Sequence, residues 1–256
     1  MTTVSDEGAR WFRRYVPEAR EAPVRLVCLP HAGGAASYFF PFAQAVGERV
    51  DVLAAQYPGR QDRRQEPCID DIGALADAAF AALRPFLDRP VALFGHSMGA
   101  TLGFELARRI ETVPGATLVR LFASGRRAPS RPGGELVHTF DDDRLLAEVA
   151  RLSGTDTRVL ADDELMRSAL PAIRADYKAA ESYRLAGEAE LGCPITALAG
   201  DADPKTSLDD VRAWERHTTA GFDLHVYAGG HFFLAEHRQP IVDLMTERLA
   251  AHTARR

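Results

Sequence analysis

The stretch FGHSMGA, residues 94–100, begins at the last residue of the apolar run VALF, residues 91–94, and is followed by a helical pattern. Residues 95–99 match G-x-S-x-G, a pattern that holds a serine on a strained turn between a strand and a helix. Glycines are needed in such a turn because a Cβ would collide with the neighbouring backbone. The alternative is that Ser97 only caps the following helix. A nucleophilic serine also needs a base, an acid and a charge-stabilising pocket, so the rest of the chain can decide between the two interpretations.

Short apolar runs alternate with helical patterns along the chain. The runs show little polar alternation, which is typical of strands that are buried on both faces. The expected strands are residues 24–29, 52–57, 91–95, 118–124, 195–200 and 223–228, and the clearest helices are 72–87, 98–110 and 240–252. This alternation predicts an α/β fold, with a mostly parallel twisted sheet and helices on both faces, in a single domain over residues 1–256.

The segment 125–191 breaks the alternation because it contains no convincing strand. Two helical patterns lie in it, at residues 141–152 and 162–185, and Pro171 interrupts the second. Long insertions within compact domains are usually functional, so we expect this segment to form a helical lid. The alternative is a crossover with extra helices and no gating role.

Composition excludes several classes of protein. The net charge of −5 gives no nucleic-acid signature, and no apolar run approaches the roughly 18 residues that a membrane span needs. The first residues include early acids and no apolar signal region. The three cysteines are widely spaced and form no CxxC pair, which argues against a disulfide framework or a zinc site. We therefore expect a cytoplasmic monomer with no metal or cofactor and no nucleic-acid or membrane partner.

The candidate base is a histidine near the C-terminus. A serine on such a turn predicts the chain order serine, acid, histidine. His231 lies in AGGHFFL, residues 228–234, directly after the last expected strand, and this is the place that the order requires. Three other histidines are poorer candidates because they lie in a helix, in a strand or near the last helix: His217, His225 and His237.

Two aspartates compete for the acid. Asp201 and Asp203 both lie in GDADP, residues 200–204, after the fifth expected strand. Either carboxylate could accept the Nδ1–H of His231 and stabilise its imidazolium form. We favour Asp203 because Pro204 holds the preceding residue extended. The other aspartate then serves the turn backbone.

The charge-stabilising pocket is expected to consist of backbone N–H groups. One comes from Met98, the residue after the serine, and the other from the loop after an early strand. The glycine-rich loop PHAGGAA, residues 30–36, follows the first expected strand, and its spacing points to the N–H of Ala32. The alternative is an ordinary glycine turn. A dinucleotide site is disfavoured because the loop lacks G-x-G-x-x-G. We expect the adjacent His31 and His96 only to shape the turns.

Taken together, five motifs resemble the type II thioesterases that accompany polyketide and nonribosomal peptide synthetases. The motifs are LPHAGG (29–34), QYPGRQDR (56–63), FGHSMGA (94–100), GDADP (200–204) and GGHFFL (229–234). They span nearly the whole chain, and PHAGG and YPGR favour this family over general esterases. The resemblance implies an α/β-hydrolase fold with a lid, and the triad Ser97, Asp203 and His231. It also implies hydrolysis of stalled or wrongly loaded short acyl groups from the phosphopantetheine thiol of a carrier protein.

Other functions remain open at this point. The chain could be a chain-releasing thioesterase, a carboxylesterase for small esters, an acyltransferase with the same acyl-enzyme chemistry, or an idle hydrolase fold that only binds carrier proteins. Carrier proteins of this kind are typically acidic, and the cluster Arg126, Arg127 and Arg131 could meet such a surface. The alternative for these arginines is a solvated loop.

Overall fold

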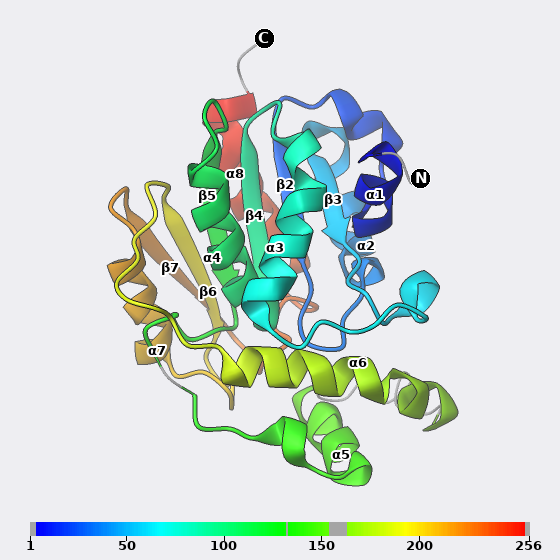
Figure 1. Cartoon of the computed structure of the whole chain (residues 1–256). Coiled ribbons are helices and arrows are strands. Elements are labelled where there is room, and N and C mark those ends of the chain that lie inside the picture. Colours follow the sequence, from blue (N-terminus) through cyan, green and yellow to red (C-terminus); the bar gives the residue numbers. More distant parts are fainter. Residues whose placement is uncertain (1–3, 132, 154–162, 254–256) are drawn as a thin grey trace.

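The computed structural model describes residues 4–131, 133–153 and 163–253, which Figure 1 shows coloured along the chain. The strands are β1 (Phe12–Arg13), β2 (Arg25–Leu29), β3 (Asp51–Ala55), β4 (Val91–His96), β5 (Leu118–Ser124), β6 (Ile195–Gly200) and β7 (Phe222–Tyr227). In the described ranges they form one seven-stranded sheet in the order β1-β3-β2-β4-β5-β6-β7. Neighbouring strands are parallel throughout, except for the antiparallel pair β1 and β3. The mostly parallel α/β sheet is therefore confirmed.

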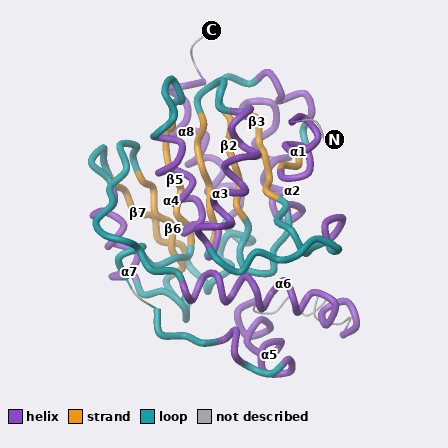
Figure 2. The backbone as a smooth tube through the Cα atoms, viewed as in Figure 1, coloured by secondary structure: helices purple, strands orange, loops and turns teal. Residues whose placement is uncertain are grey.

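Helices cover both faces of this sheet. The described α-helices are α1 (Val4–Trp11), α2 (Phe40–Val46), α3 (Ile72–Leu83), α4 (Met98–Glu111), α5 (Asp142–Ser153), α6 (Asp163–Ser182), α7 (Leu208–Arg212) and α8 (Arg238–Thr253). Helices α3 and α4 pack on one face, while α2 and α8 pack on the other. Figure 2 shows the strands as a layer between these helices. No helix in the described part of the chain is long and apolar enough to cross a membrane.

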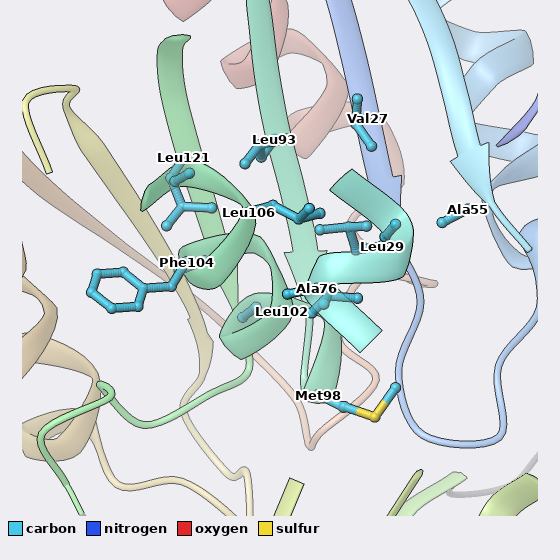
Figure 3. Packing of buried hydrophobic residues seen from close by; sticks show 14 of the residues in the cluster. Val27, Leu29, Ala55, Ala76, Leu93, Met98, Leu102, Phe104, Leu106 and Leu121 are labelled. Carbon is cyan, nitrogen blue, oxygen red and sulfur yellow. The ribbon is translucent and has the colours of Figure 1, made fainter. Parts of the chain in front are cut away.

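The alternation of side chains along the central strands explains why both faces can be covered. In β2, Val27 and Leu29 face the cluster under α3 and α4, whereas Leu26 and Cys28 face the cluster under α2 and α8. Figure 3 shows the first face, where Leu29, Leu93 and Leu121 of the strands lie beside Leu102 and Leu106 of α4. Strands that are apolar on both faces lose their apolar surface to helices on both sides, which favours this three-layer packing.

Between β5 and β6 the described residues contain helices and turns but no strand. Helix α6 lies across the edge of the sheet where the parallel strands end, and α5 packs beneath α6 (Figure 1). A separate apolar cluster holds the two helices together, with Leu145 from α5 and Leu170 and Ile173 from α6. The helical character predicted for this segment is thus present. A gating role for the segment stays a prediction.

Three features differ from the predicted elements. Pro171 was expected to interrupt a helix, but α6 runs through it without a break. The proline removes only one backbone hydrogen bond, and the packing of Leu170 and Ile173 on either side holds the helix in place. Strand β1, with two residues, and helix α7, with five, were not predicted. Both are too short for a repeating pattern of apolar residues to show in the sequence. Helix α2 was also not predicted.

Candidate active site

Ser97 lies at the turn between β4 and α4 in a conformation that is rare for a residue with a side chain. Its backbone has φ 54° and ψ −120°. The N–H of Ser97 donates to the carbonyl of Ser124 at 2.8 Å, and this bond ties the turn to the end of β5. The Ser97 side chain makes no capping hydrogen bond to α4. The interpretation of Ser97 as a helix cap is therefore wrong.

The two glycines of G-x-S-x-G make the turn possible. A Cβ on Gly95 would stand 2.1 Å from the carbonyl oxygen of Gly99, and one on Gly99 would stand 2.0 Å from the carbonyl oxygen of Leu29. Both contacts are with backbone atoms that cannot rotate away. The turn therefore packs against the end of β2 at a distance that no side chain would allow.

The structure brings Ser97, His231 and Asp203 together in one hydrogen-bonded row. Oγ of Ser97 lies 3.0 Å from Nε2 of His231, and Nδ1 of His231 lies 2.8 Å from Oδ2 of Asp203. The side chains of His231 and Asp203 are 5% and 1% exposed. In this arrangement the hydroxyl donates to Nε2 and the Nδ1–H donates to the carboxylate. Their catalytic roles stay predictions.

The competing acid and the other histidines are engaged elsewhere. Asp201 accepts the N–H of Gly229 at 2.9 Å in the turn after β7, so it serves the backbone and does not reach His231. The second carboxylate oxygen of Asp203 accepts the N–H of Lys205 at 2.8 Å, which orients the group toward the imidazole. The partners of the remaining candidates are Ala189 and Ser130 for His217, Asp223 for His225 and Ala228 for His237.

A second serine–histidine pair lies behind the first. Nδ1 of His96 is 3.1 Å from Oγ of Ser124, and both residues are fully buried. Burial, followed by the nearby His231, holds the pKa of His96 well below its usual range. Among the described residues, Nε2 of His96 has no hydrogen-bond partner, and neither His96 nor Ser124 lines the cavity beside Ser97. The pair joins the ends of β4 and β5 on either side of the turn, and a purely structural role for His96 stays a prediction.

The two predicted N–H donors lie beside the serine. Ala32 and Met98 line the same cavity as Ser97. Met98 is the first residue of α4, where a backbone N–H has no acceptor within the helix. Gly33, with φ 76°, turns the loop after Ala32. The assignment of these donors to an oxyanion stays a prediction.

Residues that the sequence analysis did not single out hold this loop from two directions. Asp176, on α6, accepts the N–H of Gly33 at 2.7 Å through Oδ2 and forms a buried ion pair with Arg60. Gln56 accepts the N–H of Ala36 at 2.8 Å. Arg60 and Gln56 belong to the motif QYPGRQDR, and this motif was the sequence signal that could have identified them. No sequence signal points to Asp176, because it lies 143 residues from Gly33 in the chain.

Buried groups in this region are kept neutral or tightly paired. Burial, with His231 and Arg60 as smaller causes, lowers the pKa of His31 to about 3, so its imidazole is neutral at physiological pH. Burial raises the pKa of Asp176, although the nearby Arg60 acts in the opposite direction. The buried charges beside the glycine-rich loop are therefore those of the Arg60–Asp176 ion pair.

A cavity opens in front of Ser97, between the ends of the strands and α6. Its walls include Ala32, Ser97, Met98, Gly125, Arg126, Arg127, Glu135, Tyr177, Ala180, Glu181, Lys205, Thr206 and His231. Helix α6 thus contributes Tyr177, Ala180 and Glu181 to the space into which Ser97 projects. In the described ranges, no group of three His, Cys, Asp or Glu side chains is arranged to hold a metal ion.

The three arginines expected to form one docking patch do not share a surface. Arg126 and Arg127 line the cavity, whereas the side chain of Arg131 is 45% exposed and lies 4.0 Å from Asp210. Sequence spacing does not show which way loop side chains point, and a contact of these arginines with a carrier protein stays a prediction. Of the three, Arg131 is the one that faces solvent to a large degree.

Comparison with known proteins agrees with this geometry. A family described as "Thioesterase domain" matches residues 24–249. The thioesterase PikA5 of Streptomyces venezuelae is 51% identical over 244 residues, covering 95% of this chain and 86% of PikA5. A probable cadicidin biosynthesis thioesterase of Streptomyces griseus is 50% identical over 237 residues. That match covers 93% of this chain but 65% of the relative, so the chain spans just under two thirds of the length of that protein.

A solved structure extends the likeness to three dimensions. The type II thioesterase BorB from the borrelidin biosynthetic cluster superposes with a TM-score of 0.88 at 52% identity. The match covers 94% of this chain and 98% of BorB. The chain therefore belongs to the thioesterase family, as a type II thioesterase with the α/β-hydrolase fold.

Proposed function

We propose that this protein hydrolyses acyl thioesters on the phosphopantetheine arm of carrier proteins in polyketide or nonribosomal peptide synthesis, removing stalled or wrongly loaded short chains. The observation that carries the proposal is the row Ser97–His231–Asp203 on a strained turn, beside a cavity that the two candidate N–H donors also line. Two relatives whose names place them in biosynthesis, the probable cadicidin biosynthesis thioesterase and BorB, support the setting. A separate carrier protein supplies the substrate.

The chemistry follows from the hydrogen-bonded row. Nε2 of His231 takes the proton of Ser97 as Oγ bonds to the thioester carbon, and the N–H groups of Ala32 and Met98 stabilise the oxyanion. The carbon–sulfur bond then breaks, and the pantetheine sulfur leaves with the proton from His231. Water next attacks the acyl-serine and gives a proton to His231, which returns it to Oγ. The products are a carboxylic acid and the free thiol.

Helix α6 and its neighbours would close over this reaction as a lid formed by residues 125–191. Tyr177, Ala180 and Glu181 of α6 already form part of the cavity wall, and α6 lies across the ends of the strands. Excluding bulk water strengthens the N–H interactions with the oxyanion.

The experiment that tests the proposal is hydrolysis of a butyryl carrier-protein thioester, measured as the amount of free thiol released. Ser97→Ala should lower kcat at least about 1,000-fold, because only binding and the oxyanion donors remain. Ser124→Ala is the matched control, since it removes the other serine that lies beside a histidine. We expect Ser124→Ala to keep turnover within about tenfold of the unaltered protein.

Two further measurements separate the rival functions. An oxygen ester of the same acyl group should be hydrolysed much more slowly than the carrier thioester, and the reverse preference would indicate a carboxylesterase. A fluorophosphonate should label the protein, and Ser97→Ala should abolish the labelling. An unlabelled protein that still binds carrier proteins would instead be an idle hydrolase fold.

A further inference from the structure

The loop of residues 30–36 is held at its two ends by side chains from the segment after β3. The hydroxyl of Tyr57 donates to the carbonyl of Pro30 at 3.2 Å, and Oε1 of Gln56 accepts the N–H of Ala36 at 2.8 Å. Both side chains are fully buried, so water does not compete for either bond. This segment therefore fixes where the chain enters and leaves the loop.

The middle of the loop is a tight turn that contains the candidate oxyanion donor. The carbonyl of His31 accepts the N–H of Gly34 at 2.9 Å, and Gly33 has φ 76°, the positive value that a type II turn requires at its third position. The His31 carbonyl and the Ala32 N–H belong to one trans peptide group, so they point in opposite directions. The direction of the Ala32 N–H is therefore fixed as long as the turn keeps its shape.

Asp176 of α6 holds the central peptide group of this turn. Its Oδ2 accepts the N–H of Gly33 at 2.7 Å, and the same oxygen accepts a hydrogen bond from Nη2 of Arg60. Ile173, one helical turn earlier, packs against the same glycine, because a Cβ on Gly33 would stand 2.8 Å from Cγ1 of Ile173. Helix α6 thus contacts the turn at the peptide group next to the Ala32 donor.

Arg60 holds the carboxylate of Asp176 in place for this contact. Nη1 of Arg60 donates to the carbonyl of Pro58 at 2.6 Å, and the guanidinium lies over the ring of Tyr57, 5.1 Å from its centroid. The side chains of Arg60 and Asp176 are 7% and 3% exposed, so solvent and salt screen the ion pair only weakly. Because Arg60 and Tyr57 lie in one segment, the middle of the loop is fastened to the same part of the protein as its ends.

We propose that Asp176 is a positioning residue for the oxyanion pocket, because it holds the turn of residues 31–34 with the Ala32 N–H directed at the reacting carbonyl oxygen. The inference rests on the proposed thioesterase function and assigns part of its geometry to α6. Asp176 acts through the backbone, since it is not among the residues that line the cavity beside Ser97. A donor aimed in advance at the oxyanion is worth about 100- to 1,000-fold in kcat, and this advantage is lost when its peptide group can reorient.

The test compares Asp176→Leu with Asp176→Asn in hydrolysis of a butyryl carrier-protein thioester. Leucine removes the acceptor of the Gly33 N–H, whereas the amide oxygen of asparagine can take the place of Oδ2 and accept from both Gly33 and Arg60. We expect Asp176→Leu to lower kcat about 100-fold with little change in KM, and Asp176→Asn to stay within about tenfold of the unaltered protein. Both variants remove the charge that pairs with Arg60, so recovery in Asp176→Asn assigns the effect to the acceptor.

A boronic acid measures the oxyanion pocket separately from turnover. Oγ of Ser97 adds to the boron of butylboronic acid while the hydroxyl proton passes to His231, and one oxygen of the resulting tetrahedral boronate takes the place of the oxyanion. The inhibition constant should rise in Asp176→Leu by about the same factor as kcat/KM falls. In Asp176→Asn it should change little.

Asp51→Leu is the matched control for lost stability. Asp51 is a fully buried aspartate that pairs with Arg14 and Arg25, but it begins β3, at the edge of the sheet opposite to Ser97. At a temperature where circular dichroism shows the variants folded, kcat and the inhibition constant of Asp51→Leu should stay within about threefold of the unaltered protein. If Asp176→Leu does not fold, the double variant Arg60→Met/Asp176→Leu replaces it, since that variant lacks the same acceptor but leaves no buried charge unpaired.

The outcomes separate the inference from the function on which it rests. If Asp176→Leu matches Asp51→Leu in kcat and boronate affinity, Asp176 only fastens α6 and the inference is wrong. Equal losses in Asp176→Leu and Asp176→Asn would also overturn it, because the acceptor of the Gly33 N–H would then have no part in the effect. An unaltered protein that hydrolyses no carrier thioester removes the proposed function, whereas the boronate comparison still tests the position of the donor.

Discussion

Gly99 lies so close to the end of β2 that a Cβ would stand 2.0 Å from the carbonyl oxygen of Leu29. Gly99 is in the first turn of α4, whereas Leu29 ends the strand that leads into the loop of Ala32. The contact therefore joins the two segments that carry the proposed N–H donors, Met98 and Ala32. It fixes their separation through backbone atoms, which makes the geometry independent of side-chain rotamers.

Gly99→Ala should consequently destabilise the protein severely. The added methyl can be accommodated only if α4 or the end of β2 moves, and we expect a loss of about 3 kcal/mol or more in the free energy of unfolding. Urea unfolding measures the loss. Gly134→Ala is the control, because nothing lies within 4 Å of a Cβ there. Equal stability of the two variants would contradict the close backbone contact between the turn and β2.

The two aspartates after β6 should behave differently when each is made neutral. In Asp203→Asn the amide oxygen stays on the N–H of Lys205, so the NH2 group faces Nδ1 of His231 and imposes the wrong tautomer, and kcat should fall about 1,000- to 10,000-fold. Asp201→Asn keeps an oxygen that can still accept from Gly229, and kcat should change by less than about tenfold. Steady-state hydrolysis of a carrier thioester, with the fold checked by circular dichroism, measures both. A larger loss in Asp201→Asn would reassign the acid.

The parts of the site that could be predicted are those set by local backbone rules. Ser97 was identifiable because strand, glycine, serine, glycine and helix are adjacent in sequence, and this order dictates the turn. His231 and Asp203 follow because the carboxyl ends of parallel strands meet at one edge of the sheet. Even the preference for Asp203 over Asp201 rested on a local effect, the restriction that Pro204 places on the residue before it.

What could not be predicted depends on contacts between distant segments. The bond from Gly33 to Asp176 joins residues 143 apart, and no spacing rule relates them. The arginines after β5 were expected to share a surface, yet Arg126 and Arg127 point into the cavity because Thr101, Ala180 and Glu135 provide acceptors there. Side-chain direction in a loop follows the available partners, and these are known only once the helices are placed.

The free energy of unfolding should decrease in acid because His96 is kept unprotonated in the folded protein. Burial lowers the pKa of His96 in the folded protein, so between about pH 6.5 and that lower value the unfolded chain binds a proton that the folded protein does not. The free energy of unfolding therefore decreases as the pH falls below about 6.5, by at most about 1.4 kcal/mol per pH unit from this group.

The variant His96→Gln isolates this contribution. It removes the titrating group but keeps a polar side chain near Oγ of Ser124, so the absolute stability is expected to fall while the acid slope becomes shallower. Urea unfolding at several pH values between about 4 and 7 measures both slopes. His237→Gln is the control, because its imidazole lies near the surface and donates to the carbonyl of Ala228. Identical slopes in the unaltered protein and His96→Gln would refute the assignment.

The ion pair between Arg60 and Asp176 provides a last prediction, because it links the loop after β3 to α6. Both side chains are nearly buried, at 7% and 3% exposed. Asp176→Leu leaves the Arg60 guanidinium without its counter-charge and the Gly33 N–H without its acceptor, so the free energy of unfolding should fall by about 3–5 kcal/mol. The double variant Arg60→Met/Asp176→Leu removes both charges and should recover part of this loss. If the double variant is instead no more stable than Asp176→Leu, the unpaired Arg60 charge is not what destabilises the single variant, and the lost acceptor of the Gly33 N–H carries the effect.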